Sequence, residues 1–301
     1  MSLDSARVLV TGASGLIGRA LVSSLKAGGV EVTSLVRSTP IGPDQIQWAP
    51  ARTLAPESVS GFDAVVHLAG DTVASRWTST KRAEIRDSRV GGTRTLTHAL
   101  AKVAKRPRVL ITSSAIGYYG DRGDEVLNEK SASGAGFLAD VCREWEAANQ
   151  PATDAGIRTV QIRTGLVLSA EGGALKKMLP PFRLGVGGRV GSGHQWMSWI
   201  HIQDMIGGIH HALKTDLLQG PVNFVAPRPV TNAEFTETLA SVLRRPAIFP
   251  VPAFAIKALF GQMGEEVLLS SQRVEPARLV TSGYPFQYSE LRKALEAVLR
   301  G

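Results

Sequence analysis

The sequence predicts an α/β protein of the Rossmann type, with a doubly wound parallel sheet and a smaller C-terminal α/β substrate lobe. In the first half of the chain, short β-rich runs alternate with helical patterns, which is the order that βαβ crossovers and a parallel sheet require. A glycine-rich turn follows the first run directly, where such sheets bind dinucleotides. After Leu168 the alternation stops and glycines punctuate a loop-rich region, so we expect a separate lobe there.

The expected elements follow in order. Apolar and β-branched runs predict five strands, at 7–11, 30–36, 63–68, 108–114 and 159–163. Apolar residues at helical spacing predict three helices among them, at 16–25, 90–104 and 139–148. Strands joined by helices in this order predict right-handed crossovers, with helices on both faces of the sheet.

The second half is expected to be less regular. Helices are predicted around 205–213, 232–243 and 265–271, and Pro180-Pro181 is expected to break a helix. We therefore divide the chain into a nucleotide-binding Rossmann core, 1–165, and a substrate-binding lobe, 166–301. The segment 198–226 is expected to return to the core.

Composition limits the class of protein. The chain has 301 residues, of which 44% are hydrophobic and 20% charged, so it can bury a large core and shows no signature of disorder. The net charge of +8 favours an anionic partner, whether nucleic acid, an acidic membrane surface or a phosphorylated small molecule, and charge alone does not choose among them. Basic residues never form a run longer than a pair and are not interleaved with aromatic ones, so we expect a small molecule and no nucleic acid.

Cysteine content and apolar patterning indicate the cellular environment in which we expect the protein. The single cysteine, Cys142, excludes an intrachain disulfide, and the absence of any His/Cys/Asp cluster at ligand spacing argues against a metal. The chain start lacks a signal-peptide core, and no apolar run reaches the about 18 residues of a membrane span. We expect a cytoplasmic monomer or homodimer with no membrane partner.

The glycine turn predicts a nucleotide site. Gly12, Gly15 and Gly18 follow the first strand and open the first helix; they permit a tight turn, approach of a pyrophosphate and close packing of helix on strand. The helix N-terminus then attracts phosphates. The residues expected to bind the cofactor here are Thr11, Gly12, Ser14, Gly15, Leu16, Ile17 and Gly18.

Arg37 and Ser38 at the end of the second strand favour NADP(H) over NAD. An NAD-binding protein usually places a carboxylate there to bind the ribose. Arginine cannot accept that bond, but its guanidinium group fits a 2′-phosphate. The alternative interpretation of Arg37 is that its side chain is solvated on the surface and binds no cofactor.

Beyond these features the chain resembles the extended, atypical short-chain dehydrogenase/reductase superfamily, in its NAD-dependent epimerase/dehydratase-like branch. The matching segments are Thr11-Gly12-x-x-Gly15-x-x-Gly18, His67-Leu68-Ala69-Gly70, and Thr112-Ser113-Ser114 leading to Tyr118-Tyr119-Gly120. Further segments resemble a subfamily classed with nucleotide-sugar epimerases, some of whose members are associated with cell or plastid division. These are Trp77, Ser88-Arg89, Phe137-Leu138-Ala139, Trp145-Glu146, the glycines from Gly172 to Gly193, Gln195, 199–204 and a C-terminal set that includes Asn223, 232–235 and Tyr284.

With the resemblance, the cofactor site is expected to extend beyond the glycine turn. The added residues are Leu68, Ala69, Gly70, Arg89, Ser113, Arg163 and Gly165. For Arg163 the alternative is an ion pair with a neighbouring helix.

The superfamily's usual catalytic pair is missing. Hydride-transferring members carry Tyr-x-x-x-Lys about 25 residues after a serine, and the lysine lowers the pKa of the tyrosine. Counting from Ser114 reaches Phe137, followed by Val141, or Leu138, followed by Cys142. Three readings stay open: Tyr118 or Tyr119 acts as the acid with Ser114 as hydrogen-bond partner, the protein binds NADP(H) without turnover, or Cys142 replaces the lysine. A small buried hydrophobe is the alternative for Cys142.

The lobe is expected to supply the substrate contacts. Gln195, Trp199 and His201 lie close together in sequence, and an amide beside aromatic faces suits a polar ring such as a sugar. For His201 the alternative is a structural histidine.

The leading prediction is an NADP(H)-dependent oxidoreductase or epimerase that acts on a nucleotide sugar or similar small molecule by hydride transfer at nicotinamide C4. Its rival is a catalytically silent NADP(H)-binding sensor or scaffold.

Overall fold

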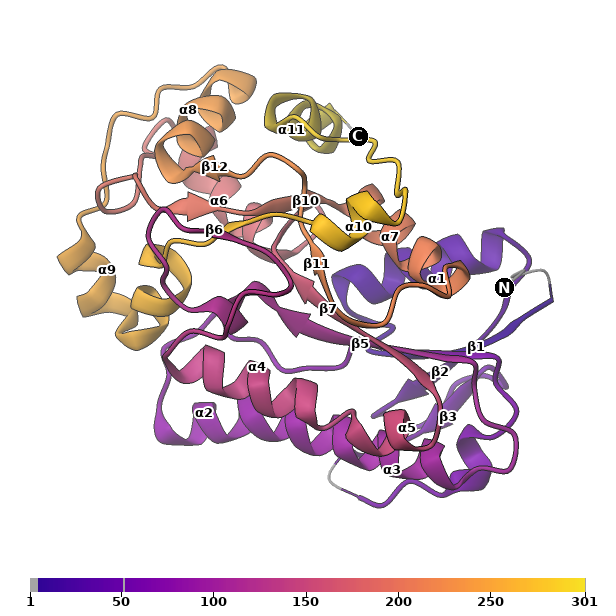
Figure 1. Ribbon diagram of the computed structural model, residues 1–301. Helices are drawn as coiled ribbons and strands as arrows, with labels where there is room; N and C mark the ends of the chain where they lie inside the picture. The colour runs from indigo at the N-terminus through magenta and orange to yellow at the C-terminus, as the bar shows by residue number, and fades with distance from the viewer. Residues whose placement is uncertain (1–4, 51, 301) are drawn as a thin grey trace.

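A seven-stranded parallel sheet forms the centre of the molecule in the computed structural model, which describes residues 5–50 and 52–300 (Figure 1). The strand order is β11-β7-β5-β4-β1-β2-β3. The bounds are β1 (Arg7–Thr11), β2 (Glu31–Val36), β3 (Gln45–Gln47), β4 (Ala64–His67), β5 (Val109–Ala115), β7 (Arg158–Thr164) and β11 (Gly220–Phe224). The α/β fold class is confirmed. Residues 1 and 301, the outer limits of the two predicted parts, lie outside the described residues.

Helices cover both faces of this sheet, as the alternating pattern predicts. On one face lie α1 (Leu16–Ala27) and α7 (Ile202–Lys214), beside the short α10 (Ala277–Thr281). On the other lie α2 (Ser79–Arg86), α3 (Gly92–Lys102), α4 (Phe137–Ala147) and α5 (Gln150–Asp154) (Figure 1). A π-helical turn, η2 (Asp87–Gly91), joins α2 to α3. The 3₁₀ turns η1 (Pro56–Val59) and η3 (Ile116–Tyr119) follow β3 and β5.

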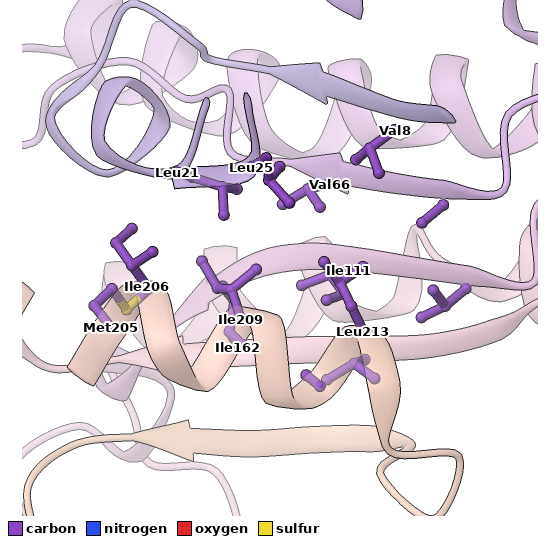
Figure 2. Packing of buried hydrophobic residues seen from close by; sticks show 14 of the residues in the cluster. Val8, Leu21, Leu25, Val66, Ile111, Ile162, Met205, Ile206, Ile209 and Leu213 are labelled. Atoms are coloured by element: carbon purple, nitrogen blue, oxygen red, sulfur yellow. The ribbon is translucent and has the colours of Figure 1, made fainter. Parts of the chain in front are cut away.

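Alternation along each strand divides the core into two layers. Val8 and Val10 of β1 belong to the cluster beneath α1 and α7, whereas Leu9 between them belongs to the cluster beneath α3. Figure 2 shows Leu21 and Leu25 of α1 and Met205, Ile209 and Leu213 of α7 around Val66, Ile111 and Ile162 of the sheet. A strand covered on both faces has no polar side, which explains the continuous apolar runs.

The remaining elements build a lobe over the carboxyl ends of the strands. Its helices are α6 (Gly173–Arg183), α8 (Asn232–Leu243), α9 (Ala253–Phe260) and α11 (Leu291–Arg300), with a π-helical turn η4 (Gly264–Leu269). Three small two-stranded sheets accompany these helices. They pair β8 (Leu166–Leu168) with β10 (Trp199–His201), β9 (Trp196–Met197) with β12 (Val230–Thr231), and β6 (Val126–Leu127) with β13 (Arg273–Val274). After β10 and before β12 the chain returns to the central sheet as β11, which adds a strand beside β7.

Pro180-Pro181 does not break a helix, contrary to the sequence expectation, because α6 continues to Arg183. Both prolines lie on the exposed face of α6, whereas Leu175, Leu179 and Phe182 are buried. The carbonyl groups that lose their N–H partners can therefore bind water, and the buried face holds the helix together.

Candidate dinucleotide site and the cleft beside it

A cleft of about 620 Å³ lies at the carboxyl ends of β1, β2 and β4, where the strand order reverses direction. This is the position at which doubly wound sheets bind nucleotides. Its lining residues come from four segments: Thr11–Gly15, Leu35–Ser38 with Ile41, Gln45, Trp48 and Pro50, Leu68–Asp71, and Ser88. Most of the residues that the sequence predicts for the cofactor are brought together here.

The glycine turn has the geometry that close approach of backbone requires. Gly12 has φ +69°, and a Cβ atom there would lie 2.7 Å from the carbonyl carbon of Leu68. A Cβ atom on Gly18 would lie 2.1 Å from the carbonyl oxygen of Gly12. No side chain caps the N-terminus of α1 at Gly15. The first N–H groups of α1 are therefore available to an anion in the cleft.

Two further residues show that the cleft fits a dinucleotide. Trp48 is buried at the edge of the cleft, and its indole N–H has no hydrogen-bond partner among the described residues. A buried donor without a partner is costly unless a ligand or water satisfies it. Arg37 is exposed on the rim and forms no ion pair with any described residue. Its guanidinium group is free to bind a phosphate.

A buried chain of hydrogen bonds supports the floor of the cleft. His67 Nδ1 lies 2.6 Å from Thr11 Oγ1, and His67 Nε2 lies 3.1 Å from Thr93 Oγ1. The Trp145 indole donates to the same Thr93 hydroxyl, and the backbone N–H of Ala69 donates to Thr11 Oγ1. Burial lowers the pKa of His67 to about 4, so the ring is neutral at pH 7. This network joins the ends of β1 and β4 to α3 and α4.

Other predicted cofactor residues lie elsewhere. Leu16 faces the loop at Gly172 and Gly173 and lines a groove between α1 and α7, and Ile17 packs against the core beneath α1. Ser113 is half-buried on β5. Gly165 permits close packing within the fold, since a Cβ atom there would lie 2.5 Å from the Ser198 carbonyl oxygen.

Arg89 is half-buried behind Gly70. It donates to the carbonyl oxygens of Asp71 and Ile85, and its guanidinium lies 5.1 Å from the Trp145 ring centre. Its donors therefore order the segment that lines the cleft.

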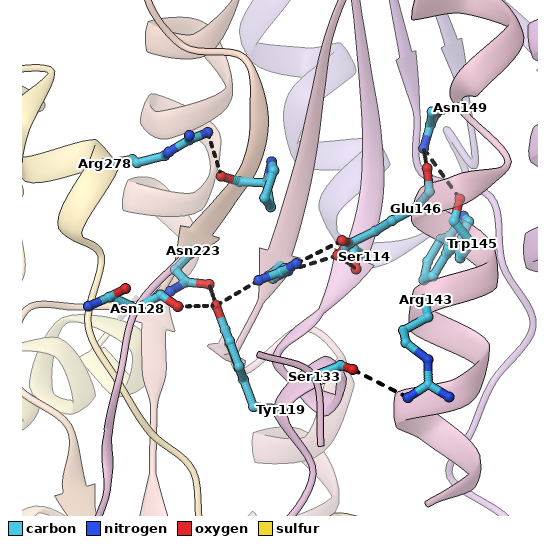
Figure 3. Close-up of polar contacts among 12 residues, drawn as sticks. Ser114, Tyr119, Asn128, Ser133, Arg143, Trp145, Glu146, Asn149, Asn223 and Arg278 are labelled. Carbon is cyan, nitrogen blue, oxygen red and sulfur yellow. Dashed lines mark hydrogen bonds and ion pairs between the residues drawn. The ribbon is translucent and has the colours of Figure 1, made fainter. Parts of the chain in front are cut away.

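A buried polar network occupies the region of the predicted catalytic residues (Figure 3). The Ser114 hydroxyl donates to Glu146 Oε1 at 2.7 Å, and Arg163 donates to both oxygens of Glu146 at 2.8 Å. Arg163 thus forms the ion pair with a neighbouring helix that the sequence left open. Its third donor reaches the Tyr119 hydroxyl at 3.0 Å.

The two tyrosines differ sharply in their surroundings. Tyr119 is fully buried, and its hydroxyl lies 2.7 Å from Asn223 Oδ1 and 3.0 Å from the Asn128 carbonyl oxygen, the two acceptors for its one proton. Burial raises the pKa of Tyr119. Tyr118 is half-buried, its ring lies 3.4 Å from the Arg163 guanidinium carbon, and no described residue bonds to its hydroxyl. Of the two, Tyr118 is the one with a free hydroxyl.

Apolar side chains fill the positions of the missing pair. Phe137 packs edge-on against Trp77 with ring centres 5.0 Å apart, in a cluster that includes Met263 and Phe260 of the lobe. Val141 is buried. Burial raises the pKa of Cys142 to about 12, so this thiol is protonated at pH 7 and cannot act as the missing cation.

A smaller cavity of about 170 Å³ lies between η3, the start of α4 and η4 of the lobe. Its residues include Gly117, Asp121, Leu138, Glu266 and Gln272. Glu266 accepts hydrogen bonds from the backbone N–H groups of Phe137 and Leu138 at 3.0 and 2.8 Å. A carboxylate from the lobe therefore caps α4 at the residue where the superfamily pattern places its tyrosine.

The three residues predicted to contact substrate are buried inside the lobe. Gln195 donates to the carbonyl oxygens of Val190 and Leu268, and the Trp199 indole donates to that of Arg228. His201 stacks on Tyr288 with ring centres 3.9 Å apart, and its Nδ1 accepts from the Gln203 backbone N–H. Their side chains organise the lobe, and none of the three lines the cleft of about 620 Å³.

Several residues of the site have no role in the predictions from sequence, although Ser88 and Glu146 lie in the matching segments. Trp48 and Ser88 line the large cleft, Glu146 holds Ser114 and Arg163, and Glu266 caps α4. Trp48 and Glu266 lie outside every recognisable motif. Only the tertiary contacts reveal them.

A Rossmann sheet with this glycine turn, a serine at the end of β5 and a lobe over the strand ends define a dinucleotide-binding protein of the extended short-chain dehydrogenase/reductase class. Residues 8–224 match the NAD dependent epimerase/dehydratase family, and residues 251–298 match a domain of unknown function, DUF1731. The chain therefore belongs to the NAD dependent epimerase/dehydratase family, and the resemblance found in the sequence is confirmed.

Relatives extend over nearly the whole chain. The Epimerase family protein Mb2239 of Mycobacterium bovis is 40% identical over 295 residues, covering 97% of each chain. The crystal structure of human epimerase family protein SDR39U1 (isoform 2) with NADPH has a TM-score of 0.90 and 38% identity, and the match covers 98% of this chain and 99% of that one. A nucleoside-diphosphate sugar epimerase from Corynebacterium glutamicum has a TM-score of 0.82 and 39% identity, covering 98% of this chain and 58% of that one.

Among the helices of the described residues, none combines the length and apolar character that a bilayer crossing needs. Within residues 5–50 and 52–300, no three His, Cys, Asp or Glu side chains lie where they could jointly hold a metal ion.

Proposed function

We propose that the protein binds NADP(H) in the cleft of about 620 Å³ and acts as an oxidoreductase or epimerase on a nucleotide sugar or a similarly polar small molecule. The observation that carries the proposal is an uncapped helix N-terminus at the glycine turn, with the unpaired Arg37 on the rim of the same cleft. The NADPH bound to the human relative supports the choice of cofactor. The Corynebacterium relative, a nucleoside-diphosphate sugar epimerase, supports the class of substrate.

The residues that would hold the cofactor are those of the cleft. The turn from Thr11 to Gly15 would bind the pyrophosphate, Arg37 and Ser38 the 2′-phosphate, and Leu68–Gly70 with Trp48 the adenosine. When bound, the nicotinamide supplies a hydride donor or acceptor at C4. The chain must supply the proton transfer, and Tyr118 has the free hydroxyl for it.

Arg37→Asp tests the cofactor assignment. We expect NADPH affinity to fall by about tenfold or more, since one charged contact is lost and a repulsive charge is introduced, while NADH affinity changes little. Titration followed by nicotinamide fluorescence measures both. Arg94→Asp, on the exposed surface of α3, is the matched control. Equal losses for the two cofactors would contradict the role of Arg37 in binding the 2′-phosphate.

A second candidate function is an NADP(H)-binding sensor or scaffold without turnover. The observation that favours it is the apolar cluster of Phe137, Trp77 and Met263 at the position of the missing pair. A screen of nucleotide sugars and small carbonyl compounds separates the two functions. NADPH oxidation or formation of an epimer supports an enzyme; cofactor binding with no turnover of any compound supports the sensor.

A further inference from the structure

Six exposed apolar side chains lie on one edge of the lobe, and we call them the apolar rim. They are Leu184, Val186, Ile248, Phe249, Phe254 and Leu259, each between 52% and 78% exposed. Single exposed apolar residues are common on proteins, but a contiguous group of large ones marks an interaction surface.

Backbone contacts bring together the segments that carry the rim. The loop after α6 and the segment before α9 run side by side, because the Phe249 N–H donates to the Gly187 carbonyl oxygen and the Val251 N–H donates to that of Arg189. Phe254 and Leu259 follow on α9, which begins at Ala253. Figure 1 shows α9 at the edge of the lobe, on the opposite side of the view from the N-terminus.

The surroundings of the rim are basic. The segments 172–203 and 238–264 contain no Asp or Glu, and their basic residues are Lys176, Lys177, Arg183, Arg189, Arg244, Arg245 and Lys257. Lys257 pairs with Glu265. The four arginines are exposed, and none forms an ion pair with a described residue. The Arg245 Nε donates to the Arg183 carbonyl oxygen, which places arginines from both segments together.

Charge decides between possible occupants of the rim. A second copy docked symmetrically would bring these arginines toward one another, which like-charge repulsion disfavours. Protruding apolar side chains surrounded by unpaired cations suit an anionic lipid surface, because the apolar groups enter the interface while the arginines bind headgroups. We propose that the apolar rim binds the surface of membranes that contain anionic lipids.

This proposal concerns association with a membrane surface and requires no spanning segment. It departs from the sequence expectation of no membrane partner, which rested on the lack of an apolar span. It is independent of the proposed enzymatic function, since the rim lies outside the cofactor cleft.

Co-sedimentation of the full-length protein with vesicles tests the proposal. Vesicles of phosphatidylcholine with about one third phosphatidylglycerol are compared with pure phosphatidylcholine, and we expect binding about tenfold or more tighter to the anionic vesicles. The variants Ile248→Ser/Phe254→Ser and Arg183→Glu/Arg244→Glu should each weaken this binding by about tenfold or more. Raised salt should weaken it as well.

Matched controls lie on other surfaces. Leu217→Ser removes an apolar side chain that is 89% exposed in the loop between α7 and β11, and Arg94→Glu reverses a charge on α3. Both should bind vesicles as the unaltered protein does, and NADPH titration checks that every variant is folded. Absence of binding to anionic vesicles, or equal binding by the rim variants, overturns the proposal. A dimer that Ile248→Ser/Phe254→Ser dissociates overturns it in favour of a second copy, and equal affinity for soluble polyglutamate overturns it in favour of an acidic protein.

Discussion

At the scale of single residues, the turn requires glycine because backbone atoms occupy the positions that a Cβ atom would take. Gly18→Ala would place a methyl group 2.1 Å from the Gly12 carbonyl oxygen. Because backbone cannot move aside as a flexible side chain can, we expect NADPH affinity to fall by about tenfold to a hundredfold, consistent with an overpacking cost of about 1–3 kcal/mol. Isothermal titration measures the loss.

Gly91→Ala provides the control for this substitution. Gly91 lies in the helical η2 turn, and beyond its chain neighbours and its own helix backbone no atom lies within 4 Å of the added Cβ. Alanine should leave cofactor affinity unchanged and stabilise the protein by up to about 1 kcal/mol. Equal cofactor affinity for the Gly18 and Gly91 variants would contradict the role of the turn.

The two tyrosines after β5 are expected to respond differently to the loss of a hydroxyl. Tyr118→Phe should abolish turnover on any substrate found in the screen, with NADPH affinity unchanged, because this hydroxyl is free for proton transfer. Tyr119→Phe should lower the free energy of unfolding by about 1–3 kcal/mol, because it leaves buried partners at Asn223 and Arg163 unsatisfied. Steady-state kinetics and urea unfolding measure the two effects. Full turnover by Tyr118→Phe would remove Tyr118 from the mechanism.

At the scale of elements, the ion pair between α4 and β7 connects a helix to the sheet. Arg163→Met would leave the Glu146 carboxylate buried with its main partner gone, and we expect a loss of about 3–5 kcal/mol in the free energy of unfolding. The double variant Glu146→Leu/Arg163→Met should recover part of this loss, because no isolated charge remains. Urea unfolding measures both variants.

Arg143 provides the comparison on the same helix. Its ion pair with Asp140 is about half exposed on both sides, so Arg143→Met should cost less than about 1 kcal/mol. Similar losses for Arg143→Met and Arg163→Met would show that burial does not determine the strength of this contact.

At the scale of the whole molecule, two buried histidines couple stability to pH. His67 lies beneath the cleft and His201 in the lobe, and burial lowers the pKa of each to about 4. The ordinary value in an unfolded chain is about 6.5. Between these values the unfolded chain binds protons that the folded chain does not, so stability is complete above about pH 6.5 and falls as the pH decreases toward 4.

The contribution of His67 to this pH dependence can be isolated. From pH 7.5 to pH 5 the unaltered protein should lose roughly 2 kcal/mol of unfolding free energy through His67 alone. His67→Gln removes this part, so its stability should depend less steeply on pH over the same interval. Urea unfolding at the two pH values measures the difference. Parallel losses for the two proteins would contradict the assignment.

The division into a core and a lobe, the oligomeric state and the cytoplasmic location stay predictions. The structure shows that β11, from the second half of the chain, completes the core sheet, and that Glu266 of the lobe caps α4 of the core. The two parts therefore contact each other in the sheet and at the start of α4.

Local patterns determined much of this protein. The five strands, the helices packed on them, the glycine turn and the absence of Tyr-x-x-x-Lys are readable from the sequence, because each depends on residues that are neighbours along the chain. Tertiary structure decided which side chains are free. The sequence predicts catalytic roles for Ser114 and Tyr119, a cofactor contact for Arg163 and a substrate contact for Trp199, yet partners far along the chain engage all four. Arg37 and Tyr118 are left without such polar partners among the described residues. The apolar rim likewise exists only because two distant segments fold side by side. Periodicity and spacing report local geometry; which polar groups find partners, and which apolar side chains stay uncovered, depends on contacts that form only in the folded chain.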